Sequence, residues 1–164
     1  MNRLVITMGD PCGVGPEIIV KFFDGIYKVE DKRLFLVVVG SKSVLEYYKK
    51  KLRIDLEIVE ITKAHIVDGK LENGKLHLIN IDTDIDKLEF GKHTELGGAL
   101  SIKYLDKAIE LCHGKYVDGI VTCPISKDSI NMAGFKYSGH TEYLAEKSTT
   151  EDFAMVLKGK KVVV

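Results

Sequence analysis

Two short runs of apolar residues, at positions 4–8 and 34–39, constrain the fold of this chain more than any other feature. Neither run alternates apolar with polar residues, and both are rich in the β-branched residues that favour strands. Unbroken apolar strands are typical of parallel sheets that are covered by helices on both faces. Each run ends at a glycine and is followed by a helical pattern, so the sequence predicts strand–loop–helix units.

The remaining sequence continues this alternation. Further strands are predicted at 55–62, 75–81 and 117–122. Helices are predicted from Pro16, after Ser43 through Lys51, across the apolar positions of 99–112, and over 125–132 and 143–147. Strands alternating with helices predict an α/β fold with a mostly parallel sheet.

The end of the chain has an unusual pattern. A strand is predicted at 153–157, a turn at 158–161, and the first residues of another strand at 162–164. Chain ends are usually polar, and a strand that stops at its third residue cannot complete its hydrogen-bond ladder. We therefore expect a truncated chain.

Charge, hydropathy and cysteine usage exclude several classes of protein. Among 164 residues, 24 Lys and Arg balance 24 Asp and Glu, which argues against a nucleic-acid binder driven by phosphate contacts. No apolar run approaches the length of a membrane span, so no membrane association is expected. The three cysteines are scattered and form no CxxC pair, which fits a reducing, cytoplasmic compartment.

A glycine-rich loop at 9–17 is the first candidate site. Its glycines at positions 9, 13 and 15 do not match the GxGxxG dinucleotide fingerprint. Two readings stay open: the glycines let the backbone approach an anionic ligand at a helix start, or they permit a tight turn with positive φ angles.

Two further segments carry candidate ligand-binding residues. Lys127 follows the strand predicted at 117–122, and ligands bind beyond the carboxyl ends of such strands. His140 and Thr141 stand side by side, where they can hold a polar or phosphorylated ligand; alternatively, Thr141 is a helix N-cap and His140 an ordinary loop residue. Cys123 has no His and acid at a spacing known for cysteine hydrolases. The other histidines, His65, His77, His93 and His113, show no metal-ligand spacing.

Taken together, these segments resemble a known enzyme family. They are residues 6–17, glycines 91, 97 and 98, residues 122–127, Gly134 and residues 139–145. In this order and at these distances they are similar to the N-terminal half of the 4-hydroxythreonine-4-phosphate dehydrogenase family of vitamin B6 biosynthesis. The resemblance covers essentially the whole chain.

The resemblance implies an isocitrate/isopropylmalate dehydrogenase-like α/β/α sandwich, with a first domain at 1–123 and the start of a second at 124–164. It implies a cytoplasmic homodimer whose active site lies at the subunit interface. The implied reaction is an NAD- or NADP-linked oxidation of 4-phosphooxy-L-threonine, with decarboxylation to 3-amino-2-oxopropyl phosphate. A divalent metal (Zn, Mg or Co) is also implied, where it acts as a Lewis acid on the reacting hydroxyl.

Carried over by position, the resemblance implies that His140, Thr141 and Lys127 contact the substrate. Gly9, Asp10, Gly13 and Gly15 match the opening loop, and no catalytic or cofactor-binding residue is assigned. The implied metal ligands lie beyond Val164, so we expect these 164 residues alone to be inactive. The alternatives are a paralogous dehydrogenase of another phosphorylated hydroxy acid, such as a four-carbon sugar-acid phosphate, or a non-catalytic half-domain.

Overall fold

Strands and helices alternate along the chain in the computed structural model, which describes residues 2–26, 34–69, 72 and 74–160. The strands are β1 (Asn2–Thr7), β2 (Leu34–Gly40), β3 (Ile58–Glu60), β4 (Leu76–Asn80) and β5 (Gly119–Thr122). The helices are α1 (Gly15–Lys21), α2 (Lys42–Leu52), α3 (Lys63–Asp68), α4 (Glu95–His113), α5 (Lys127–Met132) and α6 (His140–Lys147). A π-helical turn follows α1 at Phe22–Ile26, and a 3₁₀ turn lies at Ile85–Lys87.

The five strands form one parallel sheet in the order β3-β4-β2-β1-β5. In the centre, Val5 of β1 is in register with Val37 of β2 on one side and with Ile120 of β5 on the other. The middle of β2 is fully buried, as expected for a strand with both faces covered. The predicted α/β fold with a parallel sheet is therefore confirmed.

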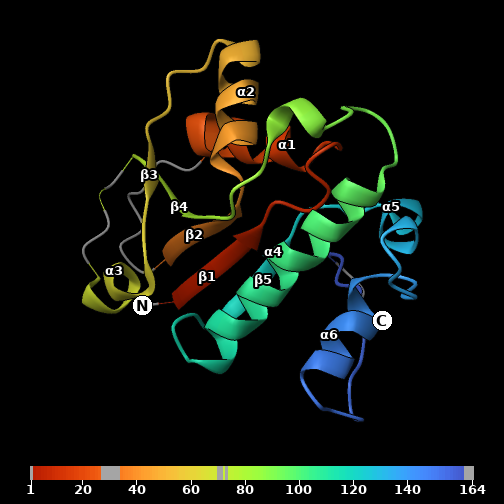
Figure 1. Ribbon diagram of the computed structural model, residues 1–164. Coiled ribbons are helices and arrows are strands. Elements are labelled where there is room, and N and C mark those ends of the chain that lie inside the picture. The colour runs from red at the N-terminus through yellow and green to blue at the C-terminus, as the bar shows by residue number, and fades with distance from the viewer. Residues whose placement is uncertain (1, 27–33, 70–71, 73, 161–164) are drawn as a thin grey trace.

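The direction of the crossovers places helices on both faces of the sheet. The chain leaves β1 toward β2, whereas α4 carries it from β4 back past β1 to β5. Since parallel crossovers are right-handed, these opposite directions put α1 and α4 on opposite faces. Figure 1 shows α1 grouped with α2, while α4 runs across the sheet apart from them. The reversal next to β1 creates a topological switch point between β1 and β5.

Helix α4 joins the sheet to the last two helices. Its first turn is capped by Thr94, whose hydroxyl accepts the Gly97 N–H at 3.0 Å. One set of its side chains belongs to the main core over the sheet; these are Leu100, Tyr104, Ala108 and Leu111. A second set packs with Ile130 of α5 and Tyr143 of α6; these are Ile102, Leu105 and Ile109. The residues after β5 are thus anchored to the body of the molecule through α4. The division into domains at residue 123 stays a prediction.

Three sequence predictions differ from the structure. The strand predicted at 153–157 is wrong: these residues form no strand, and large side chains such as Phe153 and Leu157 are exposed. Helix α3 was not predicted, because it is short and buries only Ile66. The strand at 55–62 is shorter than predicted, at Ile58–Glu60. The strand predicted to begin at Val162 lies outside the described residues. Within the described residues, no helix is both long and apolar enough to cross a membrane.

Candidate active site

A cavity of about 420 Å³ lies at the switch point, beyond the carboxyl ends of β1 and β5. The loop after β1, the segment at 91–93 and the loop after β5 form its walls. Its lining residues are Asp10, Cys12, Gly13, Val14, Gly91, Lys92, His93, Pro124, Ile125, Ser126, Lys127 and Asp128. Open α/β sheets bind their ligands in this position. We call this cavity the switch-point pocket.

Two glycines of the opening loop are required by close backbone contacts. Gly9 has a φ of +72°, and a Cβ there would lie 2.2 Å from the Pro124 carbonyl oxygen. A Cβ at Gly15 would lie 2.0 Å from the Met8 carbonyl oxygen. Real Cβ atoms do not approach backbone oxygens this closely, so any side chain would push the loop off the strand ends. The reading of a tight turn with a positive φ angle therefore holds at Gly9, whereas Gly15 has no positive φ and is required by the close backbone contact alone.

The buried carboxylate of Asp10 organises the pocket wall. One oxygen accepts the Cys12 N–H at 2.9 Å, and the other accepts the Ser129 hydroxyl at 2.9 Å. The Ser129 hydroxyl oxygen also accepts the Thr94 N–H at 3.3 Å. Asp10 thus ties together the β1 loop, the start of α5 and the start of α4. In the sequence Asp10 stands only within the opening motif, and no spacing relates it to Ser129, which lies 119 residues away.

Helix α2 and an aromatic cluster support the other side of the loop. The Tyr48 hydroxyl donates to the Gly13 carbonyl at 3.3 Å. Phe90 stacks on Tyr47 with ring centroids 4.5 Å apart, next to Gly91, whose N–H donates to the Cys12 carbonyl at 2.8 Å. The β1 loop is therefore fixed from both sides before any ligand binds.

A serine and a histidine meet in the switch-point pocket. The Ser126 hydroxyl lies 2.7 Å from Nδ1 of His93, and it also accepts the Ser129 N–H at 3.1 Å as the N-cap of α5. On the far side of the ring, His93 Nε2 lies 3.9 Å from a carboxylate oxygen of Asp128. Sequence spacing did not single out His93, because its partner is 33 residues further along the chain.

The three residues predicted to bind substrate lie at the starts of α5 and α6. Lys127 lines the switch-point pocket, is exposed, and has no hydrogen bond or ion pair among the described residues. Two hydrogen bonds from Ser138 are the main cause of the lowered pKa of Glu142, in the first turn of α6. The positive charge of Lys127 lowers this pKa further. The two helix starts therefore lie near each other.

His140 is the first residue of α6, and its side chain turns inward. Nε2 is buried with no hydrogen-bond partner in the described part of the chain. Burial lowers the pKa of His140, and a hydrogen bond to the Cys123 backbone partly opposes this shift. His140 is thus half-buried against the end of β5, not an ordinary exposed loop residue.

Thr141 follows on the exposed side of α6. It lines a shallow hollow with Leu144, Phe153 and Met155, separate from the switch-point pocket. It is not the N-cap of α6, because Gly139 occupies that position. The structure therefore brings Lys127 and His140 to the same end of β5, and places Thr141 beside them on a neighbouring surface.

Both cysteines near the pocket are unsuited to nucleophilic chemistry. Burial raises the pKa of Cys123 to about 11, and it raises that of Cys12 as well. A thiol must lose its proton to act as a nucleophile, so neither cysteine is activated.

The residues that the structure describes do not fit a complete metal centre. Nowhere among them do three His, Cys, Asp or Glu side chains gather as metal ligands. Nε2 of His140, which has no hydrogen-bond partner in the described residues, offers one nitrogen ligand but belongs to no group of three there.

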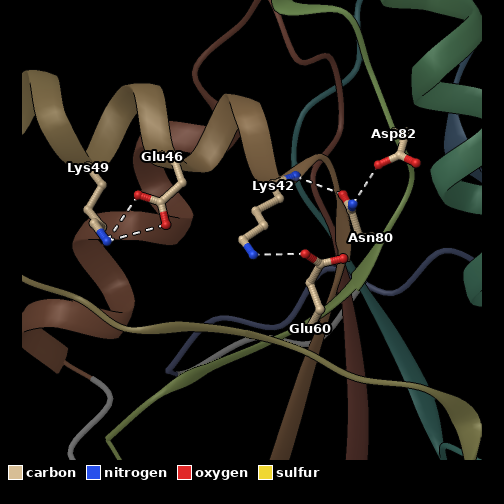
Figure 2. A network of polar contacts seen from close by, with 6 residues as sticks. All are labelled: Lys42, Glu46, Lys49, Glu60, Asn80 and Asp82. Carbon is tan, nitrogen blue, oxygen red and sulfur yellow. Dashed lines mark hydrogen bonds and ion pairs between the residues drawn. The ribbon is translucent and has the colours of Figure 1, made fainter.

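A second hollow, of about 660 Å³, lies at the carboxyl ends of β2, β3 and β4. Figure 2 shows its polar network. Lys42 pairs with Glu60 at 2.8 Å and donates its backbone N–H to Asn80, which in turn donates to Asp82. Glu46 pairs with Lys49 at 3.0 Å. Because these groups satisfy one another, the network is sufficiently explained by its role in joining β2, β3 and β4 at this edge.

Comparison with known proteins assigns the chain to a family. The fold and pocket define an α/β domain with a cavity at its switch point. The model of the family described as "Pyridoxal phosphate biosynthetic protein PdxA" matches residues 32–164. The chain belongs to the PdxA family, which confirms the resemblance drawn from the sequence motifs.

Relatives and solved structures extend this result over the whole chain. A 4-hydroxythreonine-4-phosphate dehydrogenase from Sulfurihydrogenibium sp. (strain YO3AOP1) is 40% identical over 164 residues, which are all of this chain and 48% of that protein. A Fusobacterium nucleatum protein, named provisionally as a D-threonate 4-phosphate dehydrogenase, is 39% identical over 92% of this chain and 45% of its own length.

The crystal structure of a 4-hydroxythreonine-4-phosphate dehydrogenase from Burkholderia phymatum has a TM-score of 0.86 at 28% identity. It covers 99% of this chain, which in turn covers 48% of that structure. The chain therefore spans about half the length of the relatives that it matches.

Proposed function

We propose that this chain supplies substrate-binding residues of a dehydrogenase that oxidises 4-phosphooxy-L-threonine in pyridoxal phosphate biosynthesis. The oxidised product, a β-keto acid, would lose carbon dioxide to give 3-amino-2-oxopropyl phosphate. Membership of the PdxA family and the name of the Sulfurihydrogenibium relative support this reaction. We propose that the active enzyme is a cytoplasmic homodimer with its site at the subunit interface.

The observation that carries the proposal is that, among the described residues, the unpaired ammonium group of Lys127 and the unpartnered Nε2 of half-buried His140 lie at the same end of β5. Lys127 would bind the phosphate or carboxylate of the substrate, because charge-assisted hydrogen bonds to such groups are strong. His140 has a lowered pKa, so it is neutral at pH 7. Its Nε2 would hydrogen-bond a polar group of the substrate, and Thr141, the next residue of the same helical turn, would contribute its hydroxyl.

The cofactors of this reaction are also part of the proposal. NAD or NADP would accept the hydride, since hydride transfer is the chemistry of the nicotinamide. A divalent ion (Zn, Mg or Co) would act as a Lewis acid, with ligands outside the described residues. The residues of this chain would bind and orient the substrate, and we expect the 164 residues alone to show no turnover.

The Fusobacterium relative supports a second candidate substrate. Its provisional name specifies D-threonate 4-phosphate, and its identity to this chain is within one percentage point of the other relative's. The two compounds differ chiefly at C2, which carries an ammonium group in one and a hydroxyl in the other. Either one would present a phosphate to Lys127.

Calorimetric titration of the 164-residue chain with each compound, and with inorganic phosphate, tests the proposal. We expect one phosphorylated acid to bind more tightly than phosphate. Lys127→Ala should weaken that binding about tenfold or more, given about 1.5–3 kcal/mol for a hydrogen bond to a charged group. Lys103→Ala, on the exposed face of α4, is the matched control and should have no effect. Equal binding by the parent and Lys127→Ala would contradict the proposed role.

A further inference from the structure

We propose that Ser126 and His93 form a proton relay, which carries the proton of an oxidised substrate hydroxyl from the switch-point pocket to solvent. This inference rests on the proposed dehydrogenase function. It also assigns a role to His93, which no sequence motif singled out, and to Ser126, which lies within the motif at 122–127 but had no role assigned there. Both line the pocket beside Lys127, so a substrate held by Lys127 lies next to the Ser126 hydroxyl.

The hydrogen bonds around Ser126 favour one direction of proton transfer. Its oxygen accepts the Ser129 N–H, and that bond leaves the hydroxyl proton free. His93 Nδ1, 2.7 Å away, is the nearest acceptor for this proton. On the other side of the ring, the Asp128 carboxylate lies 3.9 Å from Nε2 and favours a proton there. The expected tautomer thus has Nε2 protonated and Nδ1 accepting from Ser126.

Capping α5 does not account for this arrangement. The cap requires only a lone pair of the Ser126 oxygen. The His93 side chain is 61% exposed and Asp128 is 71% exposed, and polar pairs at such exposure add little stability. The histidine does connect the pocket wall to solvent, as a group that passes protons outward must.

The relay accounts for the proton that the proposed oxidation releases. When the alcohol becomes a ketone, a bound oxidised nicotinamide would accept the hydride from its carbon, and its oxygen loses a proton. The substrate O–H bond breaks as a new bond forms to the Ser126 oxygen, which passes its own proton to Nδ1 of His93. The imidazolium, balanced by Asp128, then loses a proton to water. Three other charged groups line the pocket. Asp10 accepts hydrogen bonds from Cys12 and Ser129, Lys92 is paired with Glu89 at 2.6 Å, and Lys127 is the third.

The first test uses the 164-residue chain and needs no activity. Nitrogen-15 NMR of labelled histidine side chains reports which imidazole nitrogen carries the proton. We expect the Nε2–H tautomer at His93, with Nδ1 shifted by its hydrogen bond, and we expect Ser126→Ala to remove that shift. Ser148→Ala, at the end of α6, is the control. A parent chain with Nδ1 protonated, or a spectrum insensitive to Ser126→Ala, would overturn the relay.

The second test uses a chimera in which these residues replace the matching half of the Sulfurihydrogenibium relative. His93→Ala should lower kcat by about 10²–10⁴-fold with KM little changed, as for loss of a general base. Added imidazole should restore part of the rate. Ser126→Ala should also lower kcat, and Ser126→Thr should retain it. His113→Ala, at the exposed end of α4, should leave activity unchanged.

The outcomes separate the two proposals. If the unmodified chimera oxidises neither phosphorylated acid, the proposed function fails and the relay fails with it. If the chimera is active but His93→Ala changes only KM, or is not rescued by imidazole, the relay alone is wrong.

Discussion

Asp10 is the residue on which the pocket wall most depends, because its buried carboxylate satisfies donors from two separate segments. We expect Asp10→Ala to lower the free energy of unfolding by about 1–3 kcal/mol, since the Cys12 N–H and the Ser129 hydroxyl would lose their acceptor while buried. Urea denaturation measures this change. The exposed carboxylate of Asp128 is the control, and Asp128→Asn should change stability by no more than about 0.5 kcal/mol. Equal effects of the two substitutions would show that the Asp10 bonds are not stabilising.

Buried His77 makes the stability of the chain depend on pH. Burial lowers its pKa, the nearby Lys75 adds to this shift, and Glu72 opposes it. Nε2 accepts the Glu72 N–H at 3.2 Å, so it carries no proton in the folded chain. The unfolded chain takes up a proton as the pH falls through about 6.5 and therefore binds more protons than the folded chain. Stability should decrease from pH 7 toward pH 5.5.

Urea unfolding at several pH values tests this dependence. His77→Gln retains an acceptor but does not titrate, so it should flatten the decrease over this window. His113→Gln, at an exposed position, should leave the slope as in the parent. Buried His140 contributes in the same direction through its lowered pKa, so some slope should remain in His77→Gln. An unchanged slope in His77→Gln would contradict the assignment.

Among the elements, the contact between α4 and α5 is the tightest at the site. A Cβ at Gly98 of α4 would lie 1.9 Å from the backbone oxygen of Ser129 in α5. We expect Gly98→Ala to separate the two helices and to cost about 1–3 kcal/mol, the usual range for overpacking. Gly25 has open space around its Cβ position, so Gly25→Ala is the matched control and should be neutral or stabilising. Thermal unfolding followed by circular dichroism compares the two variants, and similar melting temperatures would contradict this account.

The elements could be predicted where the sequence carries local periodicity. The apolar runs around Val5 and Val37 indicated buried parallel strands, and the spacing from Ala99 to Cys112 indicated α4. Local periodicity wrongly predicted a strand at 153–157. A strand requires a neighbouring strand to pair with, and none of the described residues supplies one for this segment. Lys127 was predicted to lie at the candidate site because it follows β5, and it lines the pocket; its role in substrate binding stays a prediction. The bonds of Asp10 to Ser129 and of His93 to Ser126 join distant segments, and no spacing reveals them.

At the scale of the whole molecule, β5 is an edge strand of the sheet with an exposed apolar side chain. In the described residues β5 pairs only with β1, and its Val121 is 44% exposed. The apolar side chains of 153–157 are also exposed. An uncovered edge strand with apolar side chains is a template for pairing with another chain. The candidate site lies at the carboxyl end of this same strand, so whatever covers β5 also borders the site.

We therefore expect the 164-residue chain to self-associate through the β5 edge as its concentration rises. Val121→Lys should shift the chain toward monomer, because a charge on an edge strand opposes edge-to-edge pairing. Val67→Lys places the same charge at an exposed position on α3, far from β5 in the sheet order, and should not change association. Sedimentation velocity over a range of concentrations distinguishes these outcomes. A parent chain that stays monomeric throughout, or equal effects of both substitutions, would show that β5 is not the surface through which copies meet.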